Sequence, residues 1–116
     1  MQDLSLYCAG LLGVMISIIH GYLGEMLVVR PAQTSTIQAK RVLQAIMFLS
    51  ALYWFAASVI LLITPVLLPQ EYRAIIVYGV ALIFVSGSIG NLWATQGGHF
   101  GWVLLAIAAS LAIAGA

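Results

Sequence analysis

Charged side chains are scarce in this chain. Only 6% of its 116 residues are Asp, Glu, Lys or Arg, whereas soluble domains carry about 25%. The four basic and three acidic residues leave a net charge of +1, which excludes a nucleic-acid partner because such a surface needs several phosphate contacts. This shortage of charge excludes an ordinary soluble domain and predicts an integral membrane protein.

Cysteine and the usual catalytic motifs are scarce too. Cys8 is the single cysteine, so the chain forms neither an internal disulfide nor a thiolate metal site. The sequence contains no glycine-rich phosphate loop, no Ser-His-Asp order and no paired carboxylates. We therefore expect a non-enzymatic protein without catalytic residues and without a bound metal.

What the chain does have is long apolar runs, because 64% of its residues are hydrophobic. Four runs are separated by short polar breaks at Arg30-Pro31, at Pro69 and at Thr95–Gly98. Proline and glycine end helices at such places. The sequence predicts an all-α fold: a single domain, 1–116, that is an integral membrane bundle of four transmembrane helices. Their expected ranges are 4–29, 42–68, 74–94 and 99–116, the last of which barely spans.

The basic residues predict an orientation, because short loops rich in Lys and Arg stay in the cytoplasm. The first loop contains Arg30, Lys40 and Arg41, and the second contains Arg73 alone. We expect the first and third loops to be cytoplasmic and both termini to be outside.

Small residues form stripes that favour close helix packing in lipid. In the first helix they recur at a spacing that places them on one face, and the third helix has a shorter stripe. The residues of the two stripes are Gly10, Gly13, Ser17, Gly21 and Gly24, and Gly79, Ser86 and Gly90. These faces either hold the bundle together or receive another membrane subunit.

His20 lies inside the first apolar run, where an ionisable group is by default a functional candidate. One hypothesis is a neutral imidazole that bonds a neighbouring helix through Ser50, Ser86, Ser88 or Asn91. The other is a cofactor ligand for haem or bacteriochlorophyll, together with His99. Otherwise no cofactor is expected.

Glu25 is the second ionisable group of the first apolar run. It lies five residues from both His20 and Arg30, a spacing that does not place two side chains on one face of an α-helix. We expect it to pair with Lys40 or Arg41, which the short loop brings to the same depth. The alternative is a carboxylate that binds a proton and a cation in alternation, as in a small transporter.

These landmarks resemble a family. His20-Gly-Tyr-Leu-Gly-Glu25, followed by Arg30, Arg41 and Trp54, and then Gly98-His99-Phe-Gly-Trp102, are similar to a group of small, uncharacterised four-helix bacterial inner-membrane proteins. Members carry a histidine at the position of Phe48 and a more basic third loop. The first departure weakens a shared two-histidine cofactor site, and the second removes support for the orientation. The resemblance implies a multi-pass protein of the bacterial inner membrane and no established activity.

Two classes of function follow. The leading hypothesis is an accessory subunit that packs against a larger membrane complex, with lipid and other integral membrane subunits as its partners. The rival class is a small proton- or cation-coupled transporter that uses Glu25, and a haem- or pigment-binding subunit that uses His20 is the remaining alternative.

Overall fold

The computed structural model describes residues 1–116, and its regular structure is entirely helical. This confirms the predicted all-α class with four helices. The elements are α1 (Gln2–Leu23), the π-helical segment η1 (Gly24–Val29), α2 (Ile37–Leu67), α3 (Gln70–Thr95) and α4 (Gly101–Ala114).

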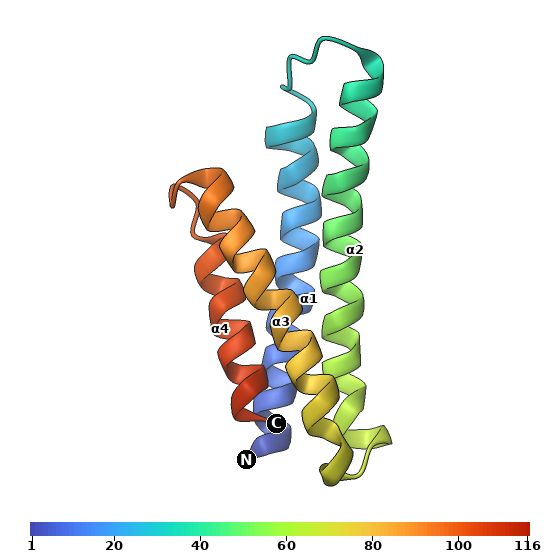
Figure 1. Ribbon diagram of the computed structural model, residues 1–116, viewed down its shortest axis with the longest axis vertical. Coiled ribbons are helices and arrows are strands. Elements are labelled where there is room, and N and C mark those ends of the chain that lie inside the picture. The colour runs from blue at the N-terminus through green and yellow to red at the C-terminus, as the bar shows by residue number, and fades with distance from the viewer.

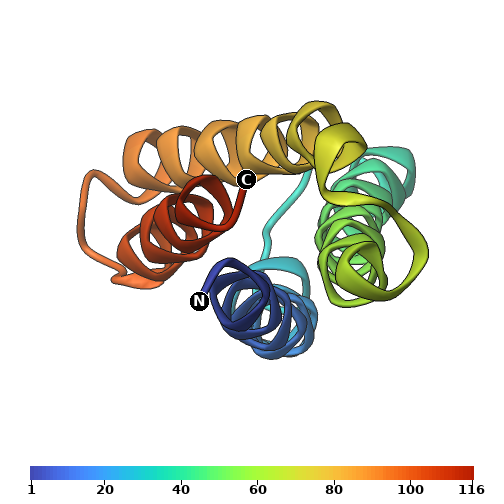
Figure 2. The same ribbon diagram turned by 90° about the horizontal axis from the view of Figure 1, so that it is seen from below.

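The helices pack in chain order around a ring (Figure 2), where α1 contacts α2 and α4 while α3 contacts α2 and α4. Both termini lie at the same end of the bundle as the link between α2 and α3 (Figure 1). The α1–α2 hairpin extends well beyond the α3–α4 hairpin at the opposite end. Its outer part is therefore not covered by the other two helices.

The core lies where all four helices overlap. It consists of apolar side chains, the largest fully buried ones being Phe84, Leu6, Leu61 and Leu105. Large apolar side chains such as Phe48, Tyr53 and Leu82 are exposed on the outer surface. An apolar core together with an apolar surface is what a helix bundle needs when hydrocarbon surrounds it.

Three helical stretches are long and apolar enough to cross a membrane: 2–29, 37–67 and 70–95. The fourth is shorter than predicted, because α4 has 14 residues and so a length of about 21 Å, less than the ~30 Å hydrocarbon layer. His99 and Phe100 lie in the turn before it, and the Gly101 N–H bonds the His99 ring instead of a helical carbonyl. The expectation of four spans, the last of them barely long enough, is thus correct in length for three helices only.

Two other helices, α2 and α3, begin earlier in the chain than predicted. The second helix begins at Ile37 rather than at residue 42, because the Thr36 hydroxyl accepts the Ala39 N–H at 3.1 Å and caps it. The third begins at Gln70 rather than at residue 74, so the expected link through Arg73 is its first turn. Hydropathy marks the part of a helix that suits lipid, whereas these polar turns lie beyond it.

Candidate functional site

His20 bonds across to α2 and lies at the edge of a cavity. Its Nε2 is 3.0 Å from the Ser50 hydroxyl, one of the four partners expected. The Ser50 hydroxyl donates to the Met47 carbonyl at 2.9 Å, so this network assigns the imidazole proton to Nε2. The ring also packs against Trp54, with centroids 4.4 Å apart. The imidazole is therefore held in one orientation by α2.

A cavity of about 260 Å³ adjoins this imidazole, at the end of the bundle nearest the α3–α4 turn. All four helices line it, and His20 and His99 both belong to its wall. His99 accepts the Gly101 N–H at Nδ1, 3.2 Å away, which assigns its own ring proton to Nε2. The structure thus brings both candidate histidines to one cavity, although they are 79 positions apart in the sequence.

Glu25 does not pair with Lys40 or Arg41. Its Oε1 accepts from Arg30 Nε at 3.5 Å, and its Oε2 accepts from Gln44 Nε2 at 3.3 Å. Arg30 is within reach because the backbone is π-helical here, and the Arg30 N–H bonds the Glu25 carbonyl five residues back. In a π-helix the backbone hydrogen bonds join residues i and i+5, so two such residues lie closer together around the helix axis than they do in an α-helix. The expected pairing assumed an α-helical turn and is corrected on that ground.

Replacing Glu25 by glutamine is expected to change stability little. The Arg30 and Glu25 side chains are 63% and 36% exposed, and exposed ion pairs contribute about 0–1 kcal/mol. Thermal melting of Glu25→Gln in detergent should therefore follow the wild type closely. Proteoliposomes report the rival role: a proton flux that is present in the wild type and abolished in Glu25→Gln would establish a coupling carboxylate instead of a structural pair.

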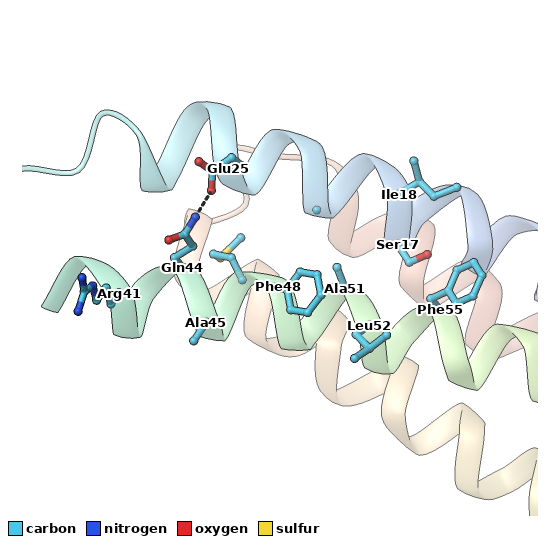
Figure 3. Close-up of a pocket in the computed structure, with 12 residues that line it drawn as sticks. Ser17, Ile18, Glu25, Arg41, Gln44, Ala45, Phe48, Ala51, Leu52 and Phe55 are labelled. Carbon is cyan, nitrogen blue, oxygen red and sulfur yellow. Dashed lines mark hydrogen bonds between the residues drawn. The ribbon is translucent and has the colours of Figure 1, made fainter. Parts of the chain in front are cut away.

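An open groove of about 810 Å³ runs between α1 and α2, starting at this carboxylate (Figure 3). Its α2 wall includes a stripe at positions 41, 45, 48, 52 and 55, which fall on one helical face, and Gln44, Met47 and Ala51 beside it. Arg41 lies at one end of the stripe, whereas Phe48 and Phe55 lie along the rest. Sequence reasoning missed this groove, although the regular spacing of the stripe was readable.

The two small-residue stripes have different roles. Those on α1 and η1 meet neighbouring helices: a Cβ added at Gly10 would lie 2.6 Å from Leu62, one at Gly13 would lie 2.2 Å from Ser58, and one at Gly24 would lie 2.4 Å from Met47. Those on α3 point outward, because a Cβ added at Gly79 or Gly90 would meet nothing within 4 Å. Ser17 is buried and Ser86 is exposed, in keeping with this division.

Sequence reasoning also missed the polar cluster at the end where the termini lie. Arg73 on α3 forms an ion pair with Asp3 on α1 and donates to two carbonyls of the α2 end, those of Pro65 and Leu68. The signal was available, since Asp3 and Arg73 are opposite charges expected at the same membrane face.

No model of a known protein family matches the chain, and the comparisons with curated proteins and with solved structures find no match either.

Proposed function

We propose that this protein is a non-enzymatic integral membrane protein, an accessory subunit that packs against a larger membrane complex through the outward face of α3. The observation that carries the proposal is the free space around Gly79 and Gly90. A glycine inside a helix is less favourable than alanine by about 0.8–1 kcal/mol. On α1 that cost is offset by close helix contact, whereas at Gly79 and Gly90 on α3 nothing within the chain requires a glycine.

The surroundings of these glycines suit a second helix. They lie with Ser86 in a shallow strip, and the exposed apolar side chains Ile75, Leu82 and Ile89 flank it. In lipid, helices associate where small residues let their backbones approach. Exposed leucine and isoleucine alone would face lipid equally well, so the glycines are what favours a transmembrane helix of another protein as the occupant.

In the proposed topology the chain lies in a bacterial inner membrane with the first and third loops in the cytoplasm. Both termini and the α2–α3 link then face the periplasm. The basic first loop supports this direction, and the common position of the two termini supports an even number of passes. The shorter α4 lies within the bilayer against α1 and α3, since Ala108, Ala109 and Ala112 on it are buried.

Leucine at Gly79 and at Gly90 is expected to release the partner without unfolding the subunit, because it fills the outward strip and its Cβ has no atom of another helix within 4 Å. Extraction from the native membrane in a mild detergent, followed by mass spectrometry, should show a protein that accompanies the wild type at fixed stoichiometry and is absent from the double variant. Ala56→Leu, an exposed change on α2, is the matched control and should retain it. A homogeneous homo-oligomer without any other protein would contradict the proposal.

A second candidate function is that of a haem- or pigment-binding subunit. The cavity that His20 and His99 share favours it. The Ser50 bond orients one imidazole, as outer partners commonly do for ligating histidines. The absorption spectrum of the same preparation is the test. A Soret or bacteriochlorophyll band that disappears in His20→Leu would support this candidate, and a featureless visible spectrum would leave the accessory role without it.

A further inference from the structure

The groove between α1 and α2 changes in character along its length. At the bundle's open end its wall is polar, with Glu25, Gln44 and Arg41, while toward the bundle's centre it is lined by Phe48 and Phe55 (Figure 3). A site with charge at one end and hydrocarbon along the rest matches a ligand of the same design. In a membrane, that ligand class is the amphipathic lipid.

The charges around the polar end have the sign that an anion needs. Arg30, Lys40 and Arg41 gather there against the single carboxylate of Glu25. Both oxygens of that carboxylate already accept hydrogen bonds, from Arg30 and from Gln44. Lys40 donates to the Arg30 carbonyl at 3.4 Å, whereas the Arg41 guanidinium has no hydrogen-bond or ion-pair partner within the chain.

We propose that this groove binds an anionic glycerophospholipid, with the lipid phosphate at Arg41 and one acyl chain along the apolar stripe of α2. A planar guanidinium presents paired N–H donors that match a phosphate. Gln44 lies one turn from Arg41 on the same face and keeps its carbonyl oxygen free for a headgroup hydroxyl. A cationic ligand would instead meet three positive side chains and a carboxylate that is already paired.

The location suits the lipid as well. The outer part of the α1–α2 hairpin extends beyond α3 and α4 (Figure 1), so a lipid can enter the groove sideways from the bilayer. Basic residues at a membrane surface attract anionic headgroups, by about 1 kcal/mol per Lys or Arg. This inference is independent of the accessory-subunit proposal, because that proposal concerns α3 and this groove is formed by α1 and α2.

Native mass spectrometry of the full-length, delipidated protein tests the charge requirement. Titration with phosphatidylglycerol should give a saturable one-to-one adduct, and phosphatidylcholine should bind more weakly. Arg41→Gln should reduce phosphatidylglycerol affinity about fivefold, the equivalent of 1 kcal/mol. Lys40→Gln removes the same charge from outside the groove and should change it less than twofold. Equal losses in the two variants would show a diffuse charge effect and overturn the site.

A second pair of variants tests the position of the acyl chain. Ala45 is exposed and lines the groove, so Ala45→Trp fills it without meeting a buried neighbour. Ala39→Trp is the matched control, because it adds the same bulk at an exposed position on the opposite side of α2. The adduct should be lost in the first and retained in the second, with both variants melting like the wild type. Retention in Ala45→Trp would overturn the proposal.

Two further probes identify the ligand class. Inorganic phosphate alone should neither form an adduct nor raise the melting temperature, because it has no acyl chain. Tetraphenylphosphonium should not compete with phosphatidylglycerol. Competition by this cation, abolished in Glu25→Gln, would replace the lipid site by a cation site, and stabilisation by phosphate alone would replace it by an ion site.

Discussion

Replacing Gly13 by alanine is expected to destabilise the bundle by about 3 kcal/mol, the upper end of the usual cost of overpacking. The added Cβ would lie 2.2 Å from Ser58 Oγ and 2.9 Å from Phe84 Cζ. Neither atom can withdraw easily. The Ser58 hydroxyl donates to the Trp54 carbonyl at 2.6 Å, and the side chains of Ser58 and Phe84 are fully buried. Helix α1 must therefore move away from α2 and α3 to accept one methyl group.

The measurement is the free energy of unfolding in mixed micelles, followed by tryptophan fluorescence during titration with SDS. Gly79→Ala is the matched control, since its added methyl group meets nothing within 4 Å. It should be neutral or stabilising by up to about 1 kcal/mol, because alanine is the better helix former. Ser58→Ala in the Gly13→Ala background should recover part of the loss. If Gly13→Ala and Gly79→Ala had equal effects, the packing of α1 on α2 described above would be wrong.

Replacing Arg73 by glutamine is expected to cost about 3 kcal/mol, because hydrogen bonds to a charged group contribute about 1.5–3 kcal/mol each. The Arg73 side chain is only 14% exposed. It donates to the carbonyls of Pro65 and Leu68, each at 2.8 Å. The Pro65 carbonyl would normally accept from residue 69, but Pro69 has no N–H. The Arg73 guanidinium supplies the hydrogen-bond donor that Pro69 lacks.

The same unfolding titration separates this role from the ion pair. Asp3→Asn removes the charge partner, which is 56% exposed, and should cost less than about 1 kcal/mol. Arg73→Lys keeps the charge but lacks the planar set of donors, so it should restore only part of the stability. A wild-type stability in Arg73→Lys would mean that charge alone matters and that the two carbonyls do not depend on the guanidinium.

The ionisable groups show which parts of the candidate sites can be predicted from local sequence and which cannot. His20 was identifiable because an imidazole stands out in an apolar run, and Ser50 was among its expected partners. The shared cavity with His99 depends on how the α3–α4 hairpin docks against α1, and no local pattern encodes that. The prediction that Glu25 pairs with Lys40 or Arg41 instead of Arg30 failed for a local reason, since the π-helical backbone at Gly24–Val29 changes which side chains align.

The amino-acid sequence by itself determined the helical class, the number of helices and the approximate breaks between them. These depend on summed hydropathy and on proline and glycine, which act over a few neighbouring residues. Only the tertiary structure decided which glycines are used: those of α1 meet α2 and α3, while Gly79 and Gly90 face outward. The two stripes look alike in sequence because spacing defines a face of a helix, whereas the rotation of that helix toward its neighbours is set by long-range packing.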